Sequence, residues 1–191
     1  FVYSSNYALY GDMSSRVMNI LANYTPEIEV YSIDEAFLKF EGFDLFNLDE
    51  YGLNIQKTVT KNTGIPISVG FAPTKALAKV ANKIAKKFPE RTKSVYAIDS
   101  EEKRIKALKW TKIEDVWGIG RKHTKRLQAV NVFNAYQFTQ LHDDWVRKEM
   151  AVVGLRLKHE LEGKPTLDLE TPKSKKMIAT TRSFEKPMTK L

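Results

Sequence analysis

Cysteine is absent from the 191 residues of this chain, and histidine occurs only three times. The lack of cysteine excludes a disulfide framework and any cysteine-ligated zinc site. The histidines, at positions 123, 142 and 159, are well separated and form no metal-ligand pattern. No apolar run approaches the roughly 18–20 residues of a membrane span, and no signal-peptide segment opens the chain. We therefore expect a protein that does not contact a membrane.

Charge is unevenly distributed along the chain. Residues 1–100 carry 11 basic and 11 acidic side chains, whereas residues 101–191 carry 20 basic and 12 acidic ones and so hold the whole net charge of +8. A clustered basic surface suits an acidic polymer, and nucleic acid is the partner of that kind that it binds best. A solvated basic face is the alternative, and charge by itself does not decide between the two.

Apolar periodicity in the first half predicts alternating strands and helices. The expected elements are a strand at 1–3, a helix at 5–24, antiparallel strands at 27–31 and 37–40, a helix from about 48 to 63, a strand at 65–71, a helix capped by Thr74 with Leu77, Val80, Ala81 and Ile84 facing inward, and a strand at 94–98. This order is typical of the split βαβ, ferredoxin-like fold, in which helices cover one side of an antiparallel sheet. The predicted fold class is therefore α+β.

After Asp99 the pattern changes to short helical segments rich in Lys and Arg, which predict a small all-helical second domain. These segments are 101–109, 112–115, 121–130, 135–141 and 145–163. Residues 167–177 have the composition of a linker, and residues 178–184 resume a β-like pattern shortly before the chain ends.

An acidic pair, Asp34 and Glu35, lies within the segment Tyr31-Ser32-Ile33-Asp34-Glu35-Ala36-Phe37. Two carboxylates inside an apolar strand pair are costly to bury unless cations neutralise them. Two Mg²⁺ ions would do so, and phosphoryl transfer uses such metals. A solvated acidic hairpin turn is the alternative, and it would be favoured for a bare Asp-Glu pair. The flanking apolar residues weaken that alternative.

Lysines follow one another along the helix predicted after Thr74, at positions 75, 79, 83 and 86. Such a row is ordinarily the solvated face of an amphipathic helix, and we interpret Lys75 and Lys79 in this way. Lys86 lies at the helix end, where its ammonium group can reach a phosphate as a point charge.

A glycine-rich turn followed by a basic helix forms the third motif. Gly118, Ile119 and Gly120 precede the basic residues Arg121, Lys122, Lys125 and Arg126. Short helices around such a turn form a helix-hairpin-helix, in which glycines let backbone N–H groups approach a DNA phosphate and the next helix N-terminus favours that anion. We expect Ile119 to pack against the hairpin core. A helix C-cap with two glycines is the alternative; DNA contacts of this kind position the duplex without reading its sequence.

Taken together, these motifs resemble the Y-family translesion DNA polymerases, and within that family the UmuC group, the catalytic subunits of bacterial DNA polymerase V. The similar segments, in chain order, are 4–18, 31–37, 69–75, 115–122 and 181–184. The resemblance implies a palm at residues 1–98, a thumb with a helix-hairpin-helix at 99–166, a linker at 167–177 and the start of a little-finger domain at 178–191.

The resemblance also implies roles for individual residues. Asp34 and Glu35 would be metal ligands and catalytic residues, Lys86 would contact the incoming triphosphate, and the Gly118–Gly120 turn with its basic helix would contact the duplex. The implied cofactor is Mg²⁺, and the implied substrates are primer-template DNA and dNTPs. UmuD′, RecA and the sliding clamp are the partners implied in the SOS response and DNA repair. The implied location is the bacterial cytoplasm, in association with the nucleoid.

In this family the first catalytic Asp and the steric-gate aromatic residue lie on the N-terminal palm strand, and a Tyr and an Arg in the fingers grip the triphosphate. All of these should precede Phe1, and most of the little finger should follow Leu191. We therefore expect a palm–thumb piece that does not polymerise by itself.

Two alternatives remain open. The first is a non-catalytic helix-hairpin-helix DNA-binding module whose acidic pair is structural. The second is a metal nuclease, which would need further acidic or histidine ligands that we do not find near the pair.

Overall fold

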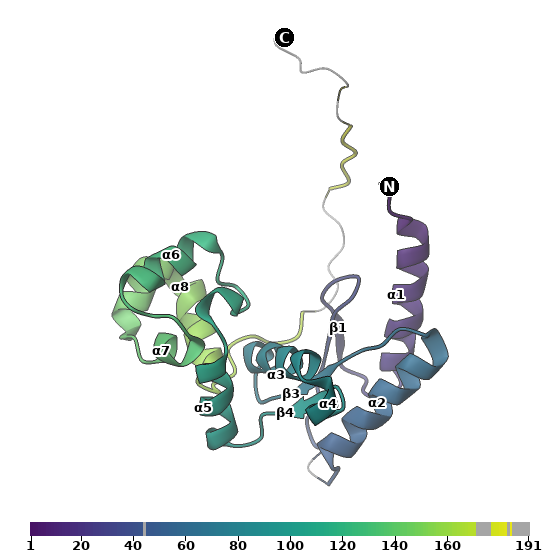
Figure 1. The fold of residues 1–191 in the computed structure, drawn as a ribbon, viewed down its shortest axis with the longest axis horizontal. Helices are drawn as coiled ribbons and strands as arrows, with labels where there is room; N and C mark the ends of the chain where they lie inside the picture. The colour runs from purple at the N-terminus through teal and green to yellow at the C-terminus, as the bar shows by residue number, and fades with distance from the viewer. Residues whose placement is uncertain (44, 171–176, 183, 185–191) are drawn as a thin grey trace.

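The computed structural model describes residues 1–43, 45–170, 177–182 and 184, with strands and helices in the first half of the chain and helices in the second (Figure 1). The α+β part spans residues 7–97 and the helical part residues 101–161. The elements are α1 (Tyr7–Leu21), β1 (Ile28–Val30), β2 (Ala36–Leu38), α2 (Leu48–Thr63), β3 (Val69–Phe71), α3 (Lys75–Lys87), α4 (Pro89–Thr92), β4 (Val95–Ala97), α5 (Glu101–Trp110), the 3-10 turn η1 (Ile113–Asp115), α6 (Arg121–Ala129), α7 (Ala135–Thr139) and α8 (Asp143–Leu161). The α+β class is confirmed.

The strands form two separate pairs and not the continuous antiparallel sheet that the sequence pattern predicts. β1 and β2 are antiparallel, with Glu29 opposite Phe37. β3 and β4 are parallel, with Gly70 opposite Tyr96. The parallel direction follows from α3, because a helix that crosses over between two strands returns the chain in its original direction.

Two of the expected strands differ in the structure. Residues 1–3 are exposed and form no strand, so that prediction was wrong. In the described residues no neighbouring strand pairs with their backbone, and an unpaired strand has no ladder to stabilise it. The strand expected at 65–71 is shortened to Val69–Phe71, the residues that pair with β4.

Local sequence signals account for the helix boundaries. Thr74 caps α3, since its Oγ1 accepts a hydrogen bond from the Leu77 backbone N–H at 3.3 Å. α2 ends at Gly64, whose φ of 74° is the left-handed conformation that glycine adopts without strain.

One hydrophobic core joins the two parts through α3. The residues predicted to face inward on this helix, Leu77, Val80, Ala81 and Ile84, are all buried. They belong to the same cluster as buried residues of the helical part, including Leu108, Leu127 and Phe138. α3 also packs on β3 and β4, so it lies between this strand pair and the helical part.

The helix α8, predicted as continuous over residues 145–163, is broken at Ala151, whose φ is 56° and ψ is −164°. Lys158 donates from Nζ to Asp143 Oδ1 at 2.7 Å. A straight helix would separate these two residues by about 22 Å, so the halves of α8 must fold back on each other. The hydrogen bond from Lys158, with a second contact to His159, lowers the pKa of the Asp143 carboxyl below its ordinary value.

The end of the chain contributes no regular element among its described residues. Residues 167–170, 177–182 and 184 have no helix or strand, so the β-like pattern at 178–184 forms no strand at the positions that can be described. Residues 171–176, 183 and 185–191, which include most of the expected linker and little-finger start, lie outside the described residues. Within the described ranges, no helix combines the length and apolarity needed to cross a bilayer.

Candidate functional site

The acidic pair lies on the turn between β1 and β2. The backbone N–H groups of Tyr31 and Ser32 both donate to the Glu35 carbonyl oxygen at 3.0 Å, and Ser32 Oγ donates to Asp34 Oδ1 at 2.6 Å. Both acidic side chains are exposed. The expectation that they are buried in the strand pair was wrong, because β1 and β2 are three residues long and their pairing ends before the acidic residues.

Glu35 is held from α3 by Lys79. Lys79 Nζ lies 2.5 Å from Glu35 Oε1 and 5.4 Å from the centroid of the Tyr31 ring. The Lys79 side chain is 23% exposed. Our interpretation of Lys79 as part of a solvated face was therefore wrong, since the hairpin places a carboxylate opposite it.

Lys75 is even less exposed, at 12%, and its interpretation as a solvated lysine was also wrong. Its Nζ lies 2.7 Å from Glu29 Oε2 and 4.7 Å from the centroid of the Phe37 ring. Glu29 is buried on β1 and also accepts a hydrogen bond from the Glu170 backbone N–H at 2.6 Å. We did not identify Glu29 from the sequence, although its position inside an apolar strand marks it as a carboxylate that needs a cation.

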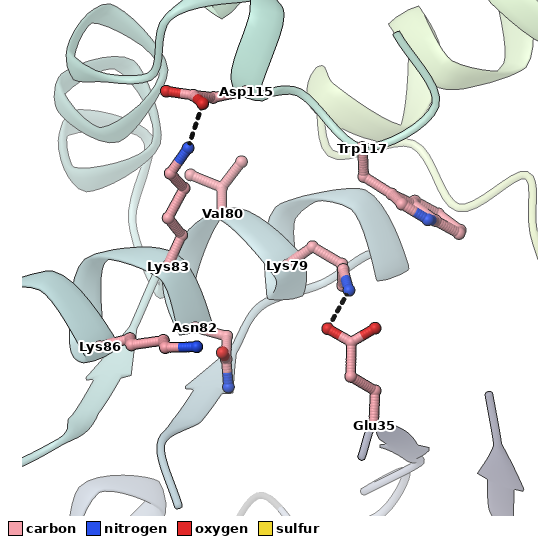
Figure 2. A pocket seen from close by; sticks show the side chains of 8 residues that line it. All are labelled: Glu35, Lys79, Val80, Asn82, Lys83, Lys86, Asp115 and Trp117. Atoms are coloured by element: carbon pink, nitrogen blue, oxygen red, sulfur yellow. Dashed lines mark hydrogen bonds and ion pairs between the residues drawn. The ribbon is translucent and has the colours of Figure 1, made fainter. Parts of the chain in front are cut away.

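A cleft of about 260 Å³ lies where the acidic turn, α3 and the helical part meet (Figure 2). Its lining residues are Glu35, Lys79, Val80, Asn82, Lys83, Lys86, Asp115 and Trp117. Lys79 and Lys83 are paired with carboxylates, the second with Asp115 at 2.8 Å. In the described residues Lys86 has no ion pair and its side chain is exposed. The cleft therefore combines three ammonium groups with two carboxylates.

Trp117 joins the helical part to the acidic turn, a contact that we did not identify from the sequence. Its Nε1 donates to Tyr31 Oη at 3.0 Å. The three rings of Tyr31, Phe37 and Trp117, which we call the aromatic cluster, have centroids 5.7 to 5.9 Å apart. The available signal was the position of Trp117 directly before Gly118.

The glycine turn has the backbone geometry expected of an anion-binding loop. Gly118 has a φ of 86°, which requires glycine, and Gly120 is the N-cap of α6 with open space around its Cα. Ile119 is buried, as predicted, and its backbone N–H donates to the Val116 carbonyl oxygen at 3.0 Å. An anion at this position would meet backbone N–H groups and the N-terminus of α6.

Exposed cations continue from this turn along α6. Arg121, Lys122 and Lys125 are all exposed. Arg126 is exposed as well, but it forms an ion pair with Glu149, whose Oε2 lies 3.3 Å from the Arg126 Nη1. Three of the four predicted basic residues are thus free of carboxylate partners within the described chain.

The acidic pair does not form a complete metal site. Asp34 and Glu35 offer the carboxylate oxygens that Mg²⁺ prefers. No group of three or more His, Asp or Glu in the described residues is arranged to hold a metal ion, and Lys79 occupies one oxygen of Glu35. The described residues therefore supply part of a Mg²⁺ ligand set and do not fit a two-metal centre.

Known proteins are similar to this chain in sequence and in fold. Residues 1–83 match the impB/mucB/samB family. The chain is 40% identical to the UmuC protein of Salmonella typhimurium over 189 residues, which cover 98% of this chain and 45% of UmuC. It is 35% identical to DNA polymerase IV of Treponema denticola over 130 residues, which cover 67% of this chain and 31% of that protein.

A solved structure of another DNA polymerase is similar to this chain in fold. The Dbh DNA polymerase in an insertion ternary complex matches with a TM-score of 0.70 and 25% identity, over 86% of this chain and 47% of Dbh. The chain thus spans less than half the length of each of these relatives. Residues 1–83 thus match the impB/mucB/samB family, and nearly the whole chain is similar to UmuC in sequence and to the Dbh DNA polymerase in fold.

Proposed function

We propose that this chain is the palm and thumb of a template-directed DNA polymerase that copies damaged DNA. The observation that carries the proposal is the cleft in which Glu35, Lys86 and the segment leading to the glycine turn meet. The family match over residues 1–83 and the similarity to UmuC and DNA polymerase IV support it. In this proposal residues 1–98 are the palm, 99–166 the helix-hairpin-helix thumb, 167–177 the linker and 178–191 the start of the little finger.

In this proposal the site residues have distinct roles in binding the nucleotide, the metal and the duplex. Lys86 binds the triphosphate of the incoming dNTP as a point charge. Asp34 and Glu35 contribute carboxylate ligands, and Mg²⁺, when bound, would neutralise phosphate charge. The Gly118–Gly120 turn and the basic face of α6 bind the duplex backbone.

Because the described ligand set is incomplete, we expect no primer extension by this chain alone. A primer-extension assay tests this expectation, and robust incorporation of dNTPs would contradict it.

The biological setting is carried over from the relatives and stays a prediction. Action in the SOS response, location in the bacterial cytoplasm, and contacts with UmuD′, RecA and the sliding clamp belong to the full-length proteins that the chain resembles. Within the described chain, we identify no residue that specifies these partners.

Neutralising the basic face of α6 is expected to weaken duplex binding. The triple variant Arg121→Ala, Lys122→Ala and Lys125→Ala removes about three phosphate contacts, so the slope of log affinity against log salt should fall by about 2 to 3. Fluorescence anisotropy with labelled duplex at several salt concentrations measures this slope.

A control triple removes the same charge elsewhere. Lys57, Lys61 and Lys87 are exposed and lie on α2 and α3, outside the proposed duplex surface. Their replacement by alanine should change the slope little. If both triples weaken binding equally, the chain attracts DNA through its net charge and not through α6.

The acidic turn separates the polymerase hypothesis from a non-catalytic binding module. If Asp34 takes part in metal and nucleotide binding, Mg²⁺ with dNTP should tighten primer-template binding in a full-length polymerase that contains this chain and supplies the remaining ligands, and Asp34→Asn should remove this gain. Asp144→Asn, at an exposed position on α8, is the matched control. DNA binding that does not depend on Mg²⁺ and is unchanged by Asp34→Asn would favour the non-catalytic module. Mg²⁺-dependent cleavage of the DNA strand would favour a nuclease.

A further inference from the structure

The acidic turn and the glycine turn lie in direct contact although they are more than 80 residues apart in the sequence. The contact is the Trp117–Tyr31 hydrogen bond at 3.0 Å, together with the edge-to-face packing of the two rings at 5.7 Å. A hydrogen bond combined with an aromatic pair fixes both distance and orientation better than either alone.

Tyr31 is connected to Glu35 by a backbone hydrogen bond and through the Lys79 side chain. Its backbone N–H donates to the Glu35 carbonyl oxygen at 3.0 Å, and its ring lies under the Lys79 ammonium group that pairs with the Glu35 carboxylate. A shift of the Tyr31 ring therefore acts on both the backbone and the side-chain partner of Glu35.

Trp117 is directly connected to the glycine turn. It is the residue before Gly118, and the turn closes on it through a hydrogen bond from the Ile119 N–H to the Val116 carbonyl oxygen at 3.0 Å. Val116 and Ile119 are both buried, so this turn is anchored on each side of Trp117. Because the chain on both sides of Trp117 is anchored, the position of the Trp117 ring is set by the position of the glycine turn.

We propose that Trp117 is a positioning residue that transmits duplex binding at the glycine turn to the placement of Glu35. The inference rests on the proposed function, since it takes the Gly118–Gly120 turn as a phosphate contact. It adds that the Gly118–Gly120 turn, which contacts the duplex, and the acidic turn are coupled through the Trp117–Tyr31 hydrogen bond. Glu35 then takes its working position in response to bound duplex.

Backbone amide NMR of the whole ¹⁵N-labelled chain tests this coupling, with a short duplex DNA as the probe. In the wild-type chain, duplex should shift the amide signals of Gly118, Gly120 and Arg121, and also those of Ser32 and Glu35. In Trp117→Phe the first group should still shift with a similar duplex affinity, whereas the shifts of Ser32 and Glu35 should fall to less than half of their wild-type size.

A second variant and a control keep the test decisive if Trp117→Phe perturbs the fold. Tyr31→Phe removes only the acceptor hydroxyl of an exposed side chain and should reduce the same two shifts. Trp110→Phe is the matched control, because Trp110, at the end of α5, packs on Phe88 and takes no part in the aromatic cluster; it should leave both groups of shifts unchanged.

The outcomes separate this inference from the proposed function. Shifts of Ser32 and Glu35 that persist in both Trp117→Phe and Tyr31→Phe would overturn the coupling, since another route would then carry it. Shifts confined to the glycine turn in the wild-type chain would overturn the coupling and leave duplex binding standing. An absence of shifts at the glycine turn would overturn both.

Discussion

Replacing Gly70 by alanine is expected to lower the free energy of unfolding by about 3 kcal/mol or more. A Cβ at this position would lie against the backbone nitrogen of Asn82 and 2.6 Å from the Ala78 carbonyl oxygen. These are backbone atoms of α3, so relief requires the whole helix to move away from β3. Urea denaturation followed by circular dichroism measures the loss.

Gly11→Ala is the matched control for this prediction. Gly11 lies inside α1, and a Cβ there would meet nothing within 4 Å. The substitution should raise stability by about 0.5–1 kcal/mol, because alanine loses less backbone entropy in a helix than glycine does. Equal unfolding midpoints for Gly70→Ala and the wild-type chain would show that α3 does not approach β3 as closely as described.

Replacing Glu160 by alanine is the second change with a large expected effect, again a loss of about 3 kcal/mol or more. Glu160 is fully buried near the end of α8. Its Oε2 accepts from the Ala76 N–H of α3 at 3.2 Å, and its Oε1 accepts from the backbone N–H groups of Thr166 and Leu167 at 2.6 and 3.0 Å. Alanine would leave these donors without their acceptor.

The measurement combines urea denaturation with amide hydrogen exchange. In Glu160→Ala the amides of Thr166 and Leu167 should exchange faster, because they lose their acceptor even where the rest of the chain stays folded. Glu160→Gln, which keeps one acceptor oxygen, should lose less stability. Glu102→Ala removes an exposed carboxylate from α5 and should change stability by no more than about 0.5 kcal/mol. If Glu160→Ala were as mild as Glu102→Ala, the carboxylate would not bridge α3 and α8.

The helices of this chain could be predicted from sequence because their signals are local. The inward positions of α3 recur at steps of three and four, and Thr74 lies where a capping hydroxyl is needed. The absence of a strand at residues 1–3 could not be predicted in the same way, because strand formation depends on a neighbouring strand, and a local apolar triplet does not show whether one is present.

The partners of charged residues were the least predictable part of the site. Lys75 and Lys79 have the spacing of a solvated helix face, and this spacing contains no information about what packs opposite. The hairpin supplies Glu29 and Glu35 from about 45 residues earlier in the chain. Trp117 and Tyr31 are likewise unremarkable in sequence until the fold brings their side chains together.

The sequence by itself determined the α+β class, the positions of most of the helices, the acidic pair, the glycine turn and the concentration of positive charge in the second half, because each depends on residue type and local spacing. Only the tertiary structure decided that the strands form two pairs, that Glu35 is held by Lys79, and that Trp117 joins the glycine turn to the acidic turn. These features depend on side chains distant in sequence, whose contacts arise when α3 packs between the strand pair and the helical part.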